Sequence, residues 1–293
     1  MLLDFIEKHS LAKEFVETAN DFYIPLAKKL AIDYQQQEKS TFFVGVNGCQ
    51  GSGKSTLTEF LAQYIKKEFN LTVAVLSLDD FYYGKAQRQQ LAQARHPLFK
   101  VRGVPGTHDI TLLASVLAQL KSGKTNICLP QFDKAQDNPF PISDWLTLSS
   151  AVDIVLFEGW CWGVPAEGFK NLQSPINKLE TKSDPQGVWR QQVNDVLREY
   201  YQPLYGFMDT WLMLKAPSFD VVFQWRLEQE QKLAKANSLT ANMNSVMGTS
   251  QVREFIQYFQ RLTVHGLNVL PSRVDMLIEL DEHRKIITSK GIE

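Results

Sequence analysis

The amino-acid sequence predicts an α/β fold in which a doubly wound, mainly parallel sheet carries helices on both faces. Short and nearly continuous apolar runs, such as residues 153–158 (Asp-Ile-Val-Leu-Phe-Glu), are typical of parallel strands buried on both faces. These runs alternate along the chain with longer segments in which apolar residues recur every three or four positions, as on one face of a helix. Alternation of this kind is typical of parallel sheets covered by helices.

A glycine-rich loop is the third observation. Residues 48–55 read Gly-Cys-Gln-Gly-Ser-Gly-Lys-Ser, with the spacing G-x-x-x-x-G-K-S, between the apolar run 41–46 and a helical pattern at 57–65. This context predicts a P-loop NTPase fold, because glycines let main-chain N–H groups approach phosphate oxygens at a helix N-terminus. An ordinary glycine turn with a surface lysine would not need these flanks. The predicted nucleotide-binding residues are Gly48, Cys49, Gln50, Gly51, Ser52, Gly53, Lys54, Ser55 and Thr56.

The loop also predicts the ligands. Lys54 is expected to reach the β- and γ-phosphates of ATP, and to act in catalysis, while the Ser55 hydroxyl is expected to bind Mg²⁺. Glu158 follows four apolar residues at the end of a predicted strand, which is where the second acidic residue of a phosphate-loop metal site would lie. The predicted metal-site residues are therefore Ser55 and Glu158.

The remaining elements follow in order. Residues 1–37 are predicted to form a helical segment, with a second helix starting at Ile24 and Pro25, and residues 38–293 a P-loop domain. Helices are also expected at about 110–122, 219–235 and 250–264. Polar segments at 84–108, 133–147 and 163–187 are longer than ordinary connections, which indicates binding loops or lids. Strands are predicted at 41–46, 72–78, 126–132, 153–158, 210–215 and 276–280, with 284–289 pairing back as a hairpin.

Composition narrows the class of protein. The chain has 293 residues, 44% of them apolar, which is enough for a sizeable core, and its net charge of −1 argues against nucleic-acid binding. It has neither an apolar stretch long enough to cross a bilayer nor a signal-peptide layout at residues 1–8, so we expect no membrane partner. Cys49, Cys128 and Cys161 form no C-x-x-C pair, which suggests reduced thiols in a cytoplasmic protein. Composition leaves the oligomeric state open.

Two adjacent carboxylates are candidates for the catalytic base. Asp79 and Asp80 directly follow the strand predicted at 72–78, and the carboxyl ends of strands border the ligand crevice of a doubly wound sheet. A carboxylate there can take the proton of an attacking hydroxyl. We expect one of the pair to be functional and the other to cap the next turn.

Several cations are candidates for the transferring phosphate or for an acceptor. Arg226 is predicted either to act as a catalytic lid arginine or to pair with Glu230 at i,i+4. Arg102 and His108 bracket a Gly-x-Pro-Gly loop and could grip an anionic acceptor, as could Lys134. The alternative for this loop is a solvated turn in which Asp109 caps the following helix.

Five segments together resemble a known family. They read Gly48 to Ser55, Ser-Leu-Asp-Asp-Phe-Tyr at 77–82, Arg-Gly-Val-Pro-Gly-Thr-His-Asp at 102–109, Pro-Gln-Phe-Asp-Lys at 130–134 and Leu-Phe-Glu-Gly-Trp at 156–160. In this order they resemble the plant-type D-glycerate 3-kinases, which belong with phosphoribulokinase, uridine kinase and type I pantothenate kinase. The resemblance spans roughly residues 40–285 and implies an ATP- and Mg²⁺-dependent kinase acting on a small hydroxylated metabolite.

By motif, the resemblance implies that Asp79 is the catalytic aspartate. The residues expected on the acceptor side are Asp80, Tyr82, Arg102, His108 and Lys134. Residues 135–141 read Ala-Gln-Asp-Asn-Pro-Phe-Pro, where the family usually carries a stretch rich in glycine and arginine, so the acceptor stays open.

Three functions remain at this point. The favoured one is phosphorylation of D-glycerate to 3-phosphoglycerate by an alcohol phosphotransferase. The second is a kinase for another small acceptor, such as pantothenate, a nucleoside or a sugar phosphate. The third is a nucleotide-hydrolysing switch, but the guanine-type run Thr-Lys-Ser-Asp at 181–184 does not follow a predicted strand.

Overall fold

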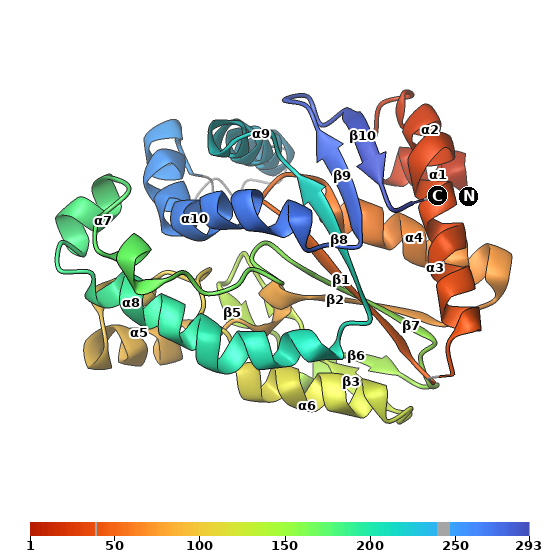
Figure 1. Ribbon diagram of the computed structural model, residues 1–293, viewed down its shortest axis with the longest axis horizontal. Helices are drawn as coiled ribbons and strands as arrows, with labels where there is room; N and C mark the ends of the chain where they lie inside the picture. The colour runs from red at the N-terminus through yellow and green to blue at the C-terminus, as the bar shows by residue number, and fades with distance from the viewer. Residues whose placement is uncertain (39, 239–246, 293) are drawn as a thin grey trace.

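The computed structural model describes residues 1–38, 40–238 and 247–292, with backbone only at 233–238, and is built on a six-stranded sheet (Figure 1). The strand order is β10-β9-β8-β1-β7-β2, and every neighbouring pair is parallel except β10 with β9. The predicted mainly parallel sheet and the C-terminal hairpin are therefore confirmed. The strands are β1 (Phe42–Gly48), β2 (Val73–Ser77), β7 (Ile154–Gly159), β8 (Thr210–Lys215), β9 (Met276–Leu280) and β10 (Ile286–Lys290).

The central strand β1 is the point at which the sheet changes direction. The chain leaves β1 for β2 on one side of the sheet and later returns to β8 and β9 on the other side. β1 and β7 are buried along their whole lengths, which explains their continuous apolar character. In a doubly wound sheet a ligand crevice forms outside the carboxyl ends of the strands at such a switch point.

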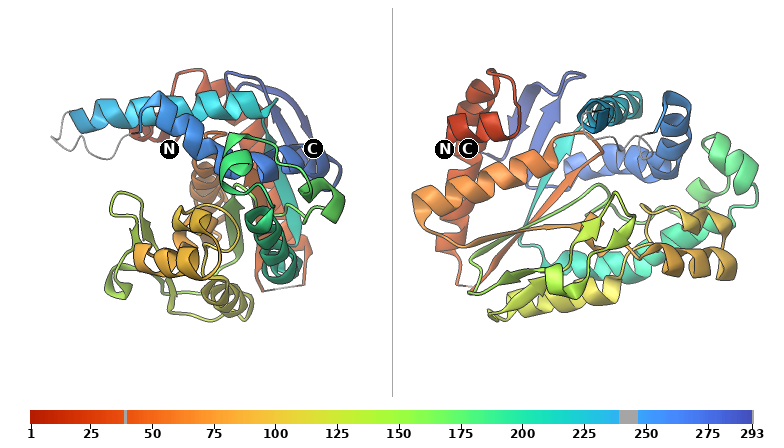
Figure 2. Two further views of the ribbon diagram at one scale, coloured as in Figure 1. Left: turned by 90° about the vertical axis from the view of Figure 1, so that its left-hand side faces the viewer. Right: turned by 180° about the vertical axis from the view of Figure 1, so that it is seen from behind.

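Helices cover both faces of the sheet. α4 (Lys54–Phe69) lies behind the sheet in Figure 1 and in front of it in the rear view of Figure 2, whereas α8 (Val188–Val196) and α10 (Thr249–Val269) lie on the opposite face. α6 (Ile110–Lys121) and α9 (Phe219–Ser238) complete the predicted helices. None of the helices in the described ranges is long and apolar enough to cross a membrane.

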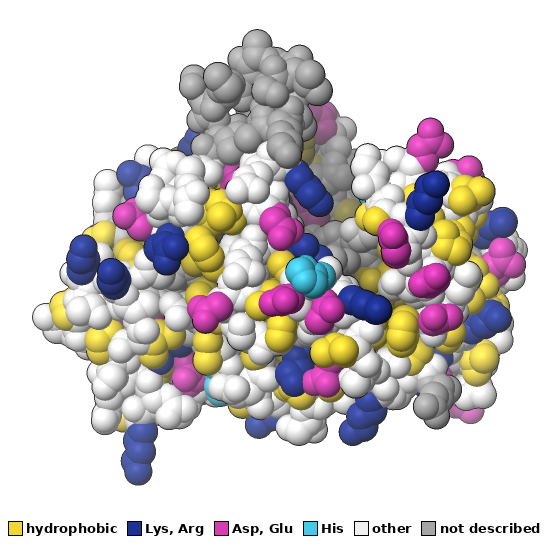
Figure 3. Space-filling model, turned by 90° about the horizontal axis from the view of Figure 1, so that it is seen from above, with side chains coloured by type: hydrophobic (Ala, Val, Ile, Leu, Met, Phe, Trp, Pro, Cys, Tyr) yellow, Lys and Arg dark blue, Asp and Glu magenta, His cyan; other side chains and the backbone are white. Residues whose placement is uncertain are grey.

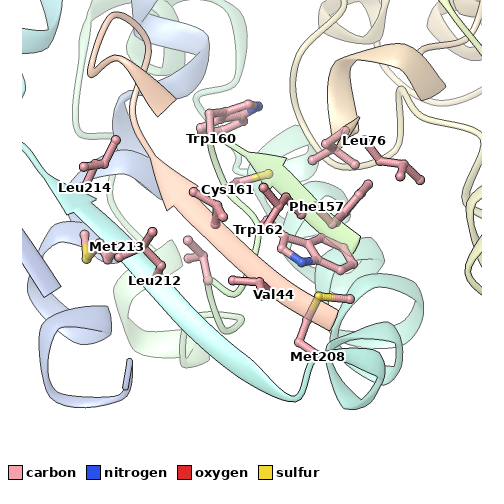
Figure 4. Packing of buried hydrophobic residues seen from close by; sticks show 14 of the residues in the cluster. Val44, Leu76, Phe157, Trp160, Cys161, Trp162, Met208, Leu212, Met213 and Leu214 are labelled. Carbon is pink, nitrogen blue, oxygen red and sulfur yellow. The ribbon is translucent and has the colours of Figure 1, made fainter. Parts of the chain in front are cut away.

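The core lies where the strands meet aromatic side chains of the connecting loops (Figure 4). Trp162 is fully buried after β7, and its ring packs edge-on against Phe157 at 4.5 Å and against Tyr205 at 4.9 Å between centroids. Val44 of β1 and Leu212 of β8 lie in the same cluster. This packing fixes the strand ends that carry the candidate site.

The N-terminal helices pack on α4. Ile24 begins α3 (Ile24–Gln36) with Pro25 in the first turn, as predicted, but a π-helical turn (Ala19–Tyr23) joins α3 to α2 (Phe15–Thr18) without the expected break. Together with α1 (Leu2–Lys8), these helices bury Phe5 against Phe60 of α4, with ring centroids 5.4 Å apart. The boundary between residues 37 and 38 stays a prediction.

The long polar segments contain more regular structure than the sequence indicates. Residues 84–108 include the helix α5 (Lys85–Ala94), and residues 163–187 include α7 (Lys178–Ser183). α5 has few apolar residues. The buried guanidinium of Arg88 holds it in place by donating to the carbonyls of Tyr83 and Lys100 at 2.9 Å each. An anchor of this kind leaves no apolar periodicity in the sequence.

The strand predicted at 126–132 lies outside the central sheet. β3 (Ile127–Leu129) pairs antiparallel with β6 (Leu146–Leu148), and β4 (Phe132–Asp133) pairs with β5 (Asn138–Pro139). We call residues 132–139 the β4–β5 hairpin. Short 3₁₀ turns link the larger elements, among them η2 (Leu78–Phe81) and η3 (Pro97–Lys100).

Removal of the Phe60 ring is expected to detach the N-terminal helices. Phe60→Ala should lower the free energy of unfolding by about 3–5 kcal/mol, because it opens a cavity between α4 and Phe5. Phe169→Ala is the matched control: Phe169 is 69% exposed, and its removal should change stability by no more than about 0.5 kcal/mol. Equal losses in denaturant-unfolding experiments would contradict the packing described.

Candidate active site

The glycine loop joins the end of β1 to the N-terminus of α4. Gly51 and Gly53 have φ angles of +78° and +92°, in the left-handed region that favours glycine. A Cβ atom on Gly51 would lie only 2.7 Å from Cβ of Trp225, so the loop also needs glycine for space. No side chain caps the first turn of α4. Its first backbone N–H groups are therefore available to bind an anionic ligand at the loop.

Unpartnered polar atoms surround this loop. The Ser52 hydroxyl and both amide atoms of Gln50 are buried and have no hydrogen-bond partner within the described part of the chain. Buried polar groups normally have a partner, and the Ser52 hydroxyl and the Gln50 amide NH₂ can donate to phosphate oxygens. The loop residues therefore fit a polyphosphate chain.

The Glu158 carboxylate contacts three side chains, two from α4 and one from β2. Its Oε1 accepts hydrogen bonds from the Ser55 hydroxyl at 2.9 Å and the Ser77 hydroxyl at 3.1 Å, and Nζ of Lys54 lies 3.6 Å from Oε2. Glu158 is only 6% exposed, at the carboxyl end of β7. Carboxylate and hydroxyl oxygens are ligands that Mg²⁺ prefers, so the pair predicted for the metal fits it.

The two neighbouring aspartates have different surroundings. Asp79 lies in η2, where β2 ends, and its carboxylate accepts from the Tyr82 hydroxyl at 2.9 Å and from Lys134 Nζ at 2.7 Å. Burial raises the pKa of Asp79, but Lys134, Lys54 and the Tyr82 hydroxyl outweigh burial and hold the pKa well below its usual range. Asp79 is therefore ionised and in contact with cations.

Asp80 serves the local structure. Its carboxylate accepts from the backbone N–H of Phe132 at 3.2 Å, which ties the β4–β5 hairpin to η2. Burial, more than the nearby acids, raises the pKa of Asp80 to about 6. Asp80 does not cap the next turn, the role considered for one of the pair, because its partner lies 52 residues away in the β4–β5 hairpin; it also lines a second cavity with Ser55 and Glu158.

A cavity of about 400 Å³ opens beside the glycine loop. Its charged lining comes from segments far apart in the sequence, and Tyr82, Trp160, Phe255 and Phe259 form its aromatic walls. The structure therefore brings together most of the predicted catalytic and acceptor-side residues. The charged residues that line the cavity include Lys54, Asp79, Arg102, Lys134 and Arg226.

Arg226 forms the predicted ion pair and also lines the cavity, while its role as a catalytic lid arginine stays a prediction. Its guanidinium forms the i,i+4 ion pair with Glu230 and also lines the cavity, where it lies 5.6 Å from the centroid of the Phe255 ring. Arg102 likewise lines the cavity while paired with Asp137 of the β4–β5 hairpin. Each guanidinium is thus held by a carboxylate next to the space that it faces.

His108 is a correction to the sequence-based prediction. It is 1% exposed and stacks on the Tyr82 ring, at 4.4 Å between ring centroids, and it is not among the residues that line the cavity. Its Nδ1 lies 2.6 Å from the Tyr201 hydroxyl. Burial lowers the pKa of His108 to about 3, although Asp79 acts in the opposite direction, so the imidazole is neutral and offers no positive charge to an acceptor. Asp109 caps α6 through the N–H of Leu112 at 2.9 Å, the alternative considered for this loop.

Sequence reasoning missed the support behind the glycine loop. Nε of Arg284 donates to the Gly51 carbonyl at 2.7 Å, and its guanidinium lies 4.9 Å from the centroid of the Trp225 ring. The indole N–H of Trp225 donates to the Glu282 carbonyl at 2.7 Å. Arg284 lies in the turn between β9 and β10, more than 200 residues from the loop, and no local pattern indicates the contact.

Several known proteins are similar to this chain in sequence. The uncharacterized kinase mug58 of Schizosaccharomyces pombe is 32% identical over 266 residues, which are 84% of this chain and 90% of that protein. The chloroplastic D-glycerate 3-kinase of Arabidopsis thaliana is 28% identical over 263 residues, which are 83% of this chain and 53% of that protein. No family model matches the chain.

A solved structure of a kinase is similar to this chain over most of its length. The D-glycerate 3-kinase of Cryptococcus neoformans superposes with a TM-score of 0.74 at 25% identity, covering 91% of this chain and 97% of that one. Because the match covers most of both chains, the predicted P-loop NTPase fold is confirmed. The chain therefore belongs to the family of P-loop kinases that includes mug58 of S. pombe and the D-glycerate 3-kinase of A. thaliana, and it is a phosphotransferase.

Proposed function

We propose that the protein transfers the γ-phosphoryl group of ATP to a hydroxyl of D-glycerate, forming 3-phosphoglycerate. The observation that carries the proposal is the position of Asp79, in a 400 Å³ cavity between Lys54 of the glycine loop and the cations Arg102 and Lys134. A cavity of this size suits a small metabolite, and its cations suit a carboxylate. Two of the relatives described above are named D-glycerate 3-kinase, which supports this acceptor.

The donor side would be held by the glycine loop. Backbone N–H groups of residues 50–56 and the ammonium of Lys54 would bind the phosphates, and Ser55 and Glu158 would hold Mg²⁺. When bound, Mg²⁺ offsets negative charge on the phosphate oxygens. Arg226 faces the same cavity and would add positive charge as the phosphoryl group moves.

The acceptor side would supply the proton acceptor. The acceptor oxygen forms a bond to the γ-phosphorus, the bond from this phosphorus to the β–γ bridging oxygen breaks, and ADP leaves with that electron pair. The hydroxyl proton passes to the carboxylate of Asp79. Trp160, Phe255 and Phe259 make an apolar wall that keeps water from competing with the acceptor.

Surface charge and the state of the cysteines bear on the partners and the location of the protein. The face in Figure 3 mixes acidic and basic side chains, and the net charge is −1, which supports a small-molecule partner and no nucleic acid. The three cysteines are free thiols, which supports a reducing, cytoplasmic location.

Lys54→Ala should abolish transfer, because the glycine loop loses the ammonium that would bind the transferring phosphate. The measurement is ADP release with ATP and Mg²⁺ in the presence of D-glycerate, pantothenate, uridine or ribulose 5-phosphate, with Lys85→Met as a control for an exposed lysine outside the cavity. The wild type should turn over ATP fastest with D-glycerate. A faster rate with another acceptor would exclude glycerate, and a rate independent of any acceptor would indicate a nucleotide switch.

Asp79→Asn should lower kcat for D-glycerate by about 10²–10⁴-fold while nucleotide binding is kept, because the amide cannot accept the proton. Single-turnover transfer and binding of a fluorescent nucleotide separate the two effects. Asp80→Asn is the neighbouring comparison and should act mainly on stability, through its contact with Phe132. Near-normal turnover in Asp79→Asn would remove the proposed base.

The neutral His108 predicts a pH dependence of stability. Its pKa is about 3 in the folded protein and 6.5 as the ordinary value, so between these limits the unfolded chain binds more protons. The contribution of neutral His108 to the free energy of unfolding is therefore complete above pH 6.5. It is lost as the pH falls towards 3, by up to about 1.4 kcal/mol per pH unit. In His108→Gln, unfolding free energies measured from pH 7 to 4.5 should fall less steeply than in the wild type; identical slopes would mean that His108 is protonated in place.

A further inference from the structure

The cations around the cavity are each paired with a carboxylate of this chain. Arg102 is paired with Asp137, Arg226 with Glu230 and Lys134 with Asp79. An acceptor that carries a carboxylate must therefore compete with one of these carboxylates for its cation.

The Lys134–Asp79 pair is the one most easily exchanged. Asp137 holds Arg102 together with the buried Arg88, whose Nη2 lies 2.7 Å from its carboxylate. Glu230 is buried, and its carboxylate also accepts from the backbone N–H of Met247 at 3.0 Å. By contrast, the side chain of Lys134 is 60% exposed and reaches Asp79 on a flexible four-carbon stem.

The hairpin backbone that carries Lys134 is held by several contacts, whereas the ammonium of Lys134 is held mainly by Asp79. The β4–β5 hairpin is tied down by Asp80 through Phe132, by Arg88 through Asp137, and by the N–H of Lys85, which donates to the Asn138 side chain at 2.9 Å. Asp79 and Lys134 also line both the 400 Å³ cavity and a neighbouring cavity of about 420 Å³ that Ser55 and Glu158 border. The ammonium can therefore turn from Asp79 into open space without any movement of the hairpin.

The ion pair with Lys134 lowers the ability of the Asp79 carboxylate to accept a proton. A carboxylate that already accepts from an ammonium at 2.7 Å and from the Tyr82 hydroxyl at 2.9 Å is a weak acceptor for a further proton. Removal of the ammonium leaves an oxygen of Asp79 free to accept the proton of an alcohol.

We propose that Lys134 is a positioning residue that holds Asp79 in an ion pair until the carboxylate of an acceptor draws the ammonium away. The inference rests on the proposed transfer to a hydroxy acid and extends it. One carboxylate replaces another on Lys134, so the exchange keeps the ion pair and frees the base at the same time. The device selects short hydroxy acids over neutral alcohols of equal size, and it suppresses transfer to water while the acceptor is absent.

The test removes the ammonium and keeps the length of the side chain. Lys134→Met should raise ATP hydrolysis without acceptor by about tenfold, because Asp79 is free to activate water. The ratio of kcat/KM for D-glycerate to that for glycerol should fall roughly 10- to 100-fold, since a charged hydrogen bond to the acid is lost while the alcohol gains a free base. Lys134→Arg keeps the charge and should keep hydrolysis low.

Two controls separate this device from a structural ion pair. The double variant Lys134→Met/Asp79→Asn should return hydrolysis to the wild-type level, because the extra rate depends on Asp79. Lys85→Met, next to the same hairpin but outside the cavity, should leave every rate unchanged.

Unchanged acceptor-free hydrolysis in Lys134→Met would overturn the inference, and so would extra hydrolysis that persists in the double variant. An equal loss for D-glycerate and glycerol would assign Lys134 a structural role only. Failure of the wild type to phosphorylate D-glycerate would instead contradict the proposed function, and the hydrolysis comparison would still decide whether Lys134 restrains Asp79.

Discussion

The buried carboxylate of Glu158 holds the active-site region together. It accepts from Ser55 at the start of α4 and from Ser77 at the end of β2, and it lies close to the ammonium of Lys54. Because β7 lies between β1 and β2, this one side chain fixes the glycine loop relative to the turn that carries Asp79. Donor-side and acceptor-side chemistry are thus positioned by neighbouring strand ends, which is where doubly wound sheets place their ligands.

The positive charges around the cavity are balanced by carboxylates of the same chain. Cations that could serve phosphate or acceptor are each held by a carboxylate, and such pairing keeps buried charge from destabilising the fold. The pairing also orients the cations towards one space. The glycine loop is supported from behind by Trp225 and Arg284, so the elements that would meet a nucleotide are largely fixed in place.

Sequence reasoning succeeded where the signal is local. The loop at 48–55, the buried strands β1, β7 and β8, and the amphipathic helices α6 and α10 each carry a pattern set by their own backbone geometry. It failed where an element is held by a distant partner. α5 depends on Arg88 and its carbonyl acceptors, and β3 pairs with β6 across a polar segment whose strands are only a few residues long. His108 looked like a loop cation, because exposure and pKa cannot be read from a Thr-His-Asp triplet.

The sequence by itself determined the phosphate loop, the parallel sheet and the placing of acidic residues at strand ends, since spacing and apolar runs express short-range steric and burial requirements. Only the tertiary structure decided that Asp80 ties the β4–β5 hairpin to η2 and that Arg226 both pairs with Glu230 and lines the cavity beside the glycine loop. It also decided that His108 is buried against Tyr82 and that Lys134 pairs with Asp79. These outcomes depend on contacts between segments tens to hundreds of residues apart, and the free energy of such contacts comes from burial and charge pairing that no local pattern encodes.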